Sequence, residues 1–285
     1  MFLMRKDGMT LIELMIALAI SVILVGGIYA IFVVQQRSYT VQDQIAAIQQ
    51  DARAAINIMA RDIRMAGMLC GAQFSVNGSE YHAVSPNNSS SGPDSITIVL
   101  AYDELSRVTS VNGSQVTVED GEKFSPNQLI AFEGVKGVYT VTSVDNDILT
   151  LNSAPPQYIA NYGATVYEVA SITYHVNNFT LQRSKTGNPV PQPLVGDESY
   201  PVVEDLQFAY KFKEDDSWYN TIPAGKGPSD VRMVRINLLV RTPVEDLDDR
   251  NYRRPALEDH PGAATTDGYR RRVLTTVVKL RNLGV

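Results

Sequence analysis

Residues Lys6-Asp7-Gly8-Met9-Thr10-Leu11-Ile12-Glu13-Leu14 begin a stretch that stays apolar as far as Val34. Between Leu14 and Val34 the only polar side chains are those of Ser21 and Tyr29. About 21 residues at ~1.5 Å each span the ~30 Å hydrocarbon core of a bilayer as one helix. Glu13 lies just inside this run, where a carboxylate is costly and indicates a functional role that requires a partner. The stretch therefore predicts a membrane-spanning helix with one functional carboxylate.

The same residues match a specific short signature. A basic leader, Gly8, an apolar residue and Thr10-Leu11-Ile12-Glu13-Leu14 resemble the prepilin motif of type IV pilins and type II secretion pseudopilins. The resemblance implies cleavage after Gly8 by a prepilin peptidase and methylation of the new amino group on Met9. It also implies that Glu13 pairs with the N-terminal amine of a neighbouring subunit, because opposite charges in an apolar bundle offset each other. The competing interpretation is a plain signal anchor with a stray glutamate.

The leader and the charges beside the helix predict its topology. A secretory signal has an apolar region of ~7–15 residues before its cleavage site, whereas here the longer apolar run follows the predicted site. The helix is therefore expected to stay with the mature chain. Arg5 and Lys6 precede the span, and only Arg37 follows closely. With the resemblance, this bias predicts a single pass of the inner membrane, N-terminus cytoplasmic and body periplasmic, before transfer to the pilus or cell surface.

Composition indicates a folded body behind this helix. The chain has 285 residues, of which 44% are hydrophobic, enough for a sizeable core. Its net charge of −6 argues against bulk nucleic-acid binding. Cys70 is the single cysteine, so no intrachain disulfide can form. Its apolar neighbours predict that the thiol is buried.

From Gln35 to Gly67 the pattern becomes that of an amphipathic helix. The apolar stripe comprises Tyr39, Val41, Ile45, Ile48, Ala52, Ile56, Met59 and Ile63. Polar residues between them, Asp62 included, are assigned to the wet face. Gly67 is the predicted helix stop. Gly26-Gly27 interrupts the apolar half, as a close-packing site or as a point where the helix unwinds on filament entry.

After a polar segment from Phe74 to Ser95, predicted to be a loop, the period changes to two residues. The predicted strands are 95–102, 107–111, 115–119, 128–132, 138–144, 148–151, 164–169, 171–176, 179–183, 202–212, 231–241 and 272–281. Asn112-Gly113 is a strong hairpin signal, with weaker ones at Asp145-Asn146 and Asn177-Asn178. The segments 108–118 and 141–151 have similar sequences and are both predicted to be hairpins, so 103–163 is predicted to be an inserted β module.

The C-terminal pieces carry a second resemblance. Residues 203–210, 231–241 and 270–283, with 60–67 at the helix end, are similar to the PilW family of minor pilins and the related J-type pseudopilins. The implied function is a minor pilin that helps to initiate or cap a type IV pilus. The implied partners are other minor pilins, the major pilin, the prepilin peptidase, the inner-membrane assembly platform and, before assembly, membrane lipid.

Catalytic and metal-binding patterns are weak. His82, His175 and His260 lack metal-ligand spacing, and no phosphate-binding glycine loop or GxSxG elbow occurs. The acidic residues Glu245, Asp246, Asp248 and Asp249 could bind calcium, but the interleaved arginines favour a solvated loop with internal ion pairs. Arg270-Arg271-Arg272 is interpreted as edge charge that discourages strand aggregation. No enzymatic activity and no cofactor are expected.

The sequence therefore predicts an α+β, pilin-like fold: a long N-terminal helix packed on an antiparallel β-rich body. The expected segments are a leader (1–8), a membrane or filament-core helix (9–34), its amphipathic half (35–67) and the body (68–285). Two alternatives remain open. One is a J-type pseudopilin of a type II secretion system; the other is a membrane-anchored periplasmic enzyme or binding protein.

Overall fold

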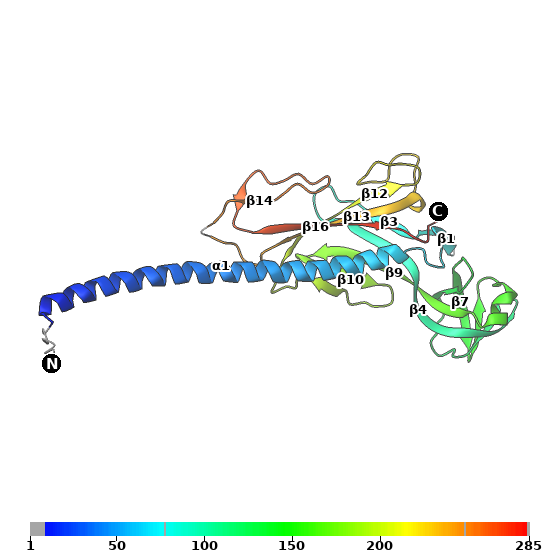
Figure 1. Cartoon of the computed structure of the whole chain (residues 1–285). Helices are drawn as coiled ribbons and strands as arrows, with labels where there is room; N and C mark the ends of the chain where they lie inside the picture. The colour runs from blue at the N-terminus through cyan, green and yellow to red at the C-terminus, as the bar shows by residue number, and fades with distance from the viewer. Residues whose placement is uncertain (1–8, 77, 248, 284–285) are drawn as a thin grey trace, which may run out of the picture. The chain divides into compact units, whose positions relative to one another are not determined.

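The structure of the protein, a computed structural model, describes residues 9–76, 78–247 and 249–283. Among these residues there is one α-helix, α1 (Leu11–Met65), which runs for 55 residues without a break (Figure 1). The chain forms two units, Met1–Ala47 and Ile48–Val285. Gly8, the predicted cleavage position, lies outside the described residues.

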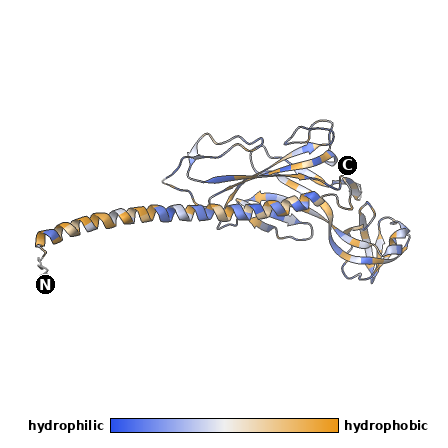
Figure 2. Ribbon diagram, viewed as in Figure 1, coloured by the Kyte–Doolittle hydropathy of each residue, from blue (hydrophilic) through white to orange (hydrophobic). Residues whose placement is uncertain are grey.

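The first unit contains the N-terminal part of α1. Every residue from 9 to 40 is exposed, and Figure 2 shows that apolar residues dominate the start of the helix. α1 is long and apolar enough to cross a membrane, and none of its most apolar window is buried within the protein. Such a surface requires lipid or neighbouring helices to cover it.

The C-terminal part of α1, from Ile48 onward, buries one face in the second unit. Its buried residues are Ile48, Ala52, Ala55, Ile56, Met59, Ala60, Asp62 and Ile63. The predicted apolar stripe is therefore confirmed from Ile48 to Ile63, but it is wrong at Tyr39, which is exposed. The assignment of Asp62 to the wet face is also wrong, because its carboxylate is paired inside the body.

α1 ends at Met65, two residues before Gly67. Gly67 has a φ of +75°, and its N–H donates to the Val99 carbonyl at 2.8 Å. A Cβ at this position would lie 2.6 Å from Leu283 Cδ2. Both the backbone conformation and the space require glycine, and the predicted helix stop is confirmed.

The body is built on a nine-stranded antiparallel sheet in the order β11-β10-β9-β6-β7-β8-β5-β4-β3, in which β9 also pairs with β4. The strands are β3 (Val84–Asn87), β4 (Ser95–Asn112), β5 (Gln115–Val118), β6 (Leu129–Phe132), β7 (Tyr139–Asp145), β8 (Ile148–Leu151), β9 (Thr165–Asn177), β10 (Thr180–Lys185) and β11 (Gln192–Val195). Strands 95–102 and 107–111 were predicted separately but form the single strand β4; likewise 164–169 and 171–176 form β9. Register shifts between Ala101 and Ser106 let β4 bend and continue its pairing with β9.

Six strands of this sheet close into a ring. β4 pairs with β5, and the pairing continues through β8, β7 and β6 to β9, which returns to β4. Their apolar side chains form a cluster of their own, from Val108 in β4 to Val166 in β9. The 3-10 helix η1 (Gln157–Tyr162) adds Ile159 to this cluster. A ring of this kind leaves its strands no free edge.

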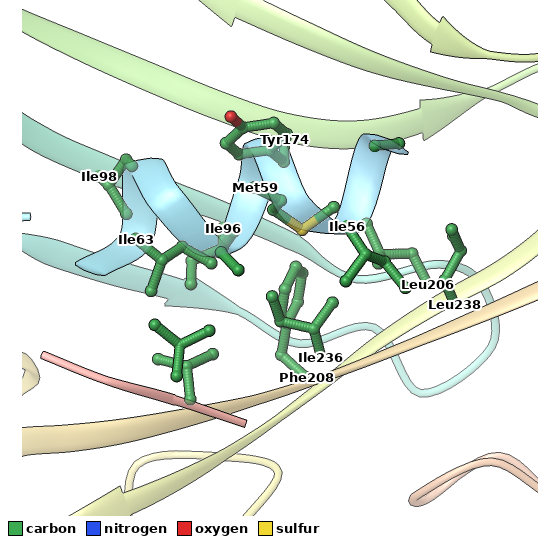
Figure 3. Packing of buried hydrophobic residues seen from close by; sticks show 14 of the residues in the cluster. Ile56, Met59, Ile63, Ile96, Ile98, Tyr174, Leu206, Phe208, Ile236 and Leu238 are labelled. Carbon is green, nitrogen blue, oxygen red and sulfur yellow. The ribbon is translucent and has the colours of Figure 1, made fainter. Parts of the chain in front are cut away.

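A second sheet of three strands has the order β12-β13-β16. Its strands are β12 (Val203–Phe212), β13 (Val231–Arg241) and β16 (Arg271–Lys279). Figure 3 shows the α1 segment with Ile56, Met59 and Ile63 between Tyr174 on one side and Phe208 and Ile236 on the other. These side chains belong to one buried cluster that joins the helix to both sheets. The helix is therefore the central layer of the main core.

The segment predicted to be a loop after the helix contains strands. β1 (Gln73–Val76) and β2 (Ser79–His82) form a hairpin, and β3 pairs with β4. The Phe74 and Tyr81 rings stack across the hairpin with centroids 5.4 Å apart. This cross-strand contact outweighs the polar composition of the segment. Of the smaller elements, η2 (Pro228–Asp230) lies between β12 and β13, and β14 (Tyr252–Arg253) and β15 (Thr266–Asp267) lie between β13 and β16.

Candidate functional site

The predicted site at the N-terminus is a capping box. Thr10 precedes the first residue of α1, and its N–H and hydroxyl both donate to Glu13 Oε2 at 2.8 Å. The Glu13 N–H lies 3.4 Å from Thr10 Oγ1. This reciprocal pattern satisfies free donors at a helix start. Met9 directly precedes the capping residue Thr10, and Glu13 Oε1 has no donor among the described residues.

The apolar surface that follows has little exposed hydrogen-bonding capacity. The Ser21 hydroxyl donates to the Ala17 carbonyl at 2.7 Å, so the one small polar side chain is satisfied by its own helix. Ideal Cβ atoms at Gly26 and Gly27 would meet no atom within 4 Å. The structure of the single chain therefore gives no steric reason for these glycines.

A buried ionic cluster fixes α1 in the body. Arg183 on β10 reaches Asp62 Oδ2 through Nη2 at 2.9 Å and Nε at 3.0 Å. The Tyr174 hydroxyl donates to the same oxygen at 2.6 Å, and Arg183 Nη2 also donates to the Tyr102 hydroxyl at 3.1 Å. Burial, followed by the hydrogen bond to Asp62, raises the pKa of Tyr174 well above its usual range. The cluster holds the helix on the sheet by hydrogen bonds as well as by apolar packing.

A second buried polar cluster ties three chain segments together. His260 Nδ1 lies 2.8 Å from Asp205 Oδ2, and its Nε2 lies 2.9 Å from the Ser89 carbonyl. Both ring nitrogens face acceptors, which suits the imidazolium form. Burial lowers the pKa of His260, but the hydrogen bonds to Asp205 and Ser89 outweigh it and raise the pKa overall. Because Nε2 is engaged by a backbone carbonyl, the histidine is not arranged as a general base beside a nucleophile.

The charged loop between β13 and β16 is internally paired. Arg250 pairs with Glu245 at 2.5 Å, and Arg270 lies 3.7 Å from Asp246 and 3.5 Å from Asp249. These described residues follow the predicted arrangement of internal ion pairs, while Asp248 lies outside the described residues. No group of three or more potential metal-ligating side chains occurs in the described part of the chain.

The interpretation of Arg270-Arg271-Arg272 as edge charge is wrong for two of the three residues. Arg271 is 6% exposed and pairs with Glu204 and with Asp267. Arg270 turns toward the loop carboxylates. Glu204 and Asp267 hold the Arg271 side chain away from the strand edge, and Asp246 and Asp249 do the same for Arg270. Of the three arginines, only Arg272 is exposed at this edge.

Sequence reasoning missed most of the body's functional geometry. Asp62 is three residues after Met59, so helical spacing alone places it next to the buried stripe, and this signal was available. Tyr174, Arg183 and His260 gave no comparable signal, because their partners lie far away in the sequence. Cys70 was predicted correctly: it is 3% exposed, and burial raises the pKa of its thiol to about 12.

Two models of known protein families match this chain, one near each end. The family model described as Prokaryotic N-terminal methylation motif matches residues 3–29. The model described as Type IV Pilus-assembly protein W (PilW) matches residues 158–282, which include the pieces 203–210 and 231–241 and all of 270–283 but its last residue. The chain is a type IV pilus minor pilin of the PilW type. As a prepilin-type protein, it is anchored by its apolar helix and interacts with pilus components and the prepilin peptidase.

Comparisons with solved structures and with curated proteins give no further evidence on the function of this minor pilin. A type IV-like pilin from Thermus thermophilus is similar over 83% of this chain and 97% of its own, with 18% identity and a TM-score of 0.44. A search of curated proteins found no match to this chain. The α+β, pilin-like fold predicted from the sequence is confirmed by α1 and the antiparallel strands themselves.

Proposed function

We propose that this minor pilin is cleaved after Gly8, methylated on Met9 and inserted into a pilus through Glu13, where it helps to initiate or cap the fibre. Before assembly it spans the inner membrane once, with its N-terminus in the cytoplasm and its body in the periplasm. Afterwards it is displayed at the cell surface. Other minor pilins, the major pilin and the assembly platform are its partners, and it acts by assembly rather than by catalysis.

The observation that carries the proposal is the geometry at Glu13. Glu13 is exposed near the start of the helix, close to Met9 in the sequence, and uses one carboxylate oxygen for the Thr10 cap while the other has no donor among the described residues. A neighbouring N-terminal ammonium group can therefore approach Glu13 without breaking the cap. In an apolar filament core this pairing offsets two charges that are costly when alone.

We assign a separate role to each segment of the chain. We assign residues 1–8 to the leader, 9–34 to the membrane or filament core, 35–67 to the amphipathic half of the helix and 68–285 to the body. Within the body we treat 103–163 as an inserted module, because most of its buried apolar residues belong to a cluster, from Val108 to Val166, that is separate from the main one. In this assignment the module lies on the surface of the body, and the packing of α1 in the main cluster does not depend on it.

The test uses two changes at one residue. Glu13→Ala removes both the charge and half of the capping box, whereas Glu13→Gln removes the charge and keeps a side chain that can cap. We expect both variants to reach the membrane but to be depleted at least about tenfold from sheared fibres, which corresponds to ~1.4 kcal/mol. Asp51→Ala, an exposed acid on the same helix, is the matched control and should enter fibres normally. Normal entry of Glu13→Gln would refute the charge-pairing role.

A further inference from the structure

Most strand edges of the body are closed in the ring, short, or covered by other backbone. The closed ring leaves none, and the end strands β3 and β11 are only four residues long, β11 with Pro193 in it. β12 is long, but its outer side is occupied. The Asp94 N–H donates to the Leu206 carbonyl at 2.8 Å, the Phe208 N–H donates to Asp94 Oδ2 at 2.9 Å, and Tyr210 exchanges two backbone hydrogen bonds with Tyr219.

β16 is the exception. It pairs with β13 over nine consecutive residues without a register shift. Among the described residues, no hydrogen bond reaches the other side of its backbone between Arg272 and Val278. An unpaired edge that is both long and regular is a template for another strand.

The centre of this edge carries nothing that repels a second strand. Residues 273–278 are Val-Leu-Thr-Thr-Val-Val, with no charge and no proline. Val273 and Val277 are 42% and 45% exposed. Because Arg270 and Arg271 are drawn into ion pairs elsewhere, the usual guard against strand addition is missing along six residues.

Exposed cationic side chains lie at both ends of the β16 edge, and another lies on α1 beside it. Arg272 stands at one end and Lys279 at the other, both exposed. Arg53 on α1 lines a groove of about 400 Å³ together with Asn57 and residues 273–276. None of these three cations has an ion-pair partner among the described residues. An antiparallel second copy would place Arg272 opposite Lys279, so like charges would meet twice, which is unfavourable.

We infer that the open edge of β16 is a docking site for an extended segment of another protein, with an uncharged, β-branched centre and acidic residues at both ends. The backbone of the segment adds to the β12-β13-β16 sheet, and its acidic ends meet Arg272 and Lys279. This strand addition is separate from assembly through the N-terminal helix. It would give the body a contact of its own, independent of Glu13.

The experiment uses the full-length chain in neutral detergent micelles and a synthetic peptide with a Thr/Val centre and two glutamates at each end. Binding is followed by fluorescence anisotropy, and amide hydrogen exchange shows where the peptide binds. We expect saturable binding with slowed exchange in 271–279. The same peptide with a central proline should bind at least about tenfold more weakly, because proline cannot donate to the ladder.

Matched variants test the charges separately from the edge. Arg272→Glu with Lys279→Glu should reverse the preference, so that a lysine-ended peptide binds at least about tenfold more tightly than the glutamate-ended one. Val277→Glu should weaken the original peptide, and Val277→Thr should not. Any of four results would overturn the inference: no saturable binding, indifference to the central proline, protection outside 271–279, or self-association of the chain through β16, which would make a second copy the occupant.

Discussion

Removing the Asp62 carboxylate should destabilise the body more than any loss of surface charge. The Asp62 side chain is 1% exposed and that of Arg183 is 10% exposed. Asp62→Ala leaves the guanidinium buried with only the Tyr102 and Tyr174 hydroxyls nearby. Breaking a buried pair from one side costs about 3–5 kcal/mol, so the free energy of unfolding should fall by that amount.

The reciprocal and double variants separate pairing from packing. Arg183→Met leaves Asp62 buried without its cation and should cost a similar ~3–5 kcal/mol. Asp62→Leu with Arg183→Met removes both charges and restores apolar volume, so it should cost far less than the sum of the two single changes. Asp51→Ala, exposed on the same helix, should stay within about 0.5 kcal/mol of the parent chain.

Urea unfolding of the full chain in detergent measures these values. Trp218 is the single tryptophan, and the Arg235 guanidinium lies 4.5 Å from its ring centre, so its fluorescence reports on the three-stranded sheet. If Asp62→Ala costs less than about 1 kcal/mol, or if the double change costs as much as the sum of the singles, the ion pair does not hold the helix on the sheet.

Gly67→Ala should lower the free energy of unfolding by about 1–3 kcal/mol in the same urea assay, because φ is +75° and the new Cβ would press on Leu283; an unchanged midpoint would refute this. Cys70 should resist iodoacetamide in the folded chain and react once urea unfolds it, as measured by intact mass, because burial raises its pKa to about 12. Burial raises the folded pKa of Asp94 from 3.8 to about 6, so the stability contributed by its protonated form should be lost as pH rises from about 4 to about 6. The pKa of His260 is raised from 6.5 despite burial, so the stability contributed by its imidazolium form should be lost as pH rises above about 6.5. Urea midpoints across these pH ranges should show the fall in stability, and Asp94→Asn should reduce its slope; a slope of the opposite sign would contradict the assignment.

Local signals in the sequence were sufficient for the helix and the turns. The prepilin motif, the apolar run and Gly67 are each read from neighbouring residues. The same holds for Asn112-Gly113 between β4 and β5 and for Asp145-Asn146 between β7 and β8, where Asn146 has a φ of +49°. Such features depend on backbone preferences within a few residues, which a single sequence contains.

Long-range features could not be found in this way. The ring closes only because β9 pairs with β4 across more than fifty residues, and no local pattern encodes that contact. Helical spacing from Met59 places Asp62 next to the buried stripe, but its pairing partner Arg183, which makes the burial tolerable, is 121 positions away. The inward turn of Arg271 depends likewise on Glu204. In each case the partner decides the outcome, and the partner is distant in sequence.

Maturation at the N-terminus and incorporation into a fibre are tested most directly by intact mass and N-terminal sequencing of the protein from sheared pili. We expect a chain that begins at N-methylated Met9 and lacks residues 1–8. A chain that retains Met1, or one that is mature in the membrane but absent from the fibre fraction, would contradict this expectation.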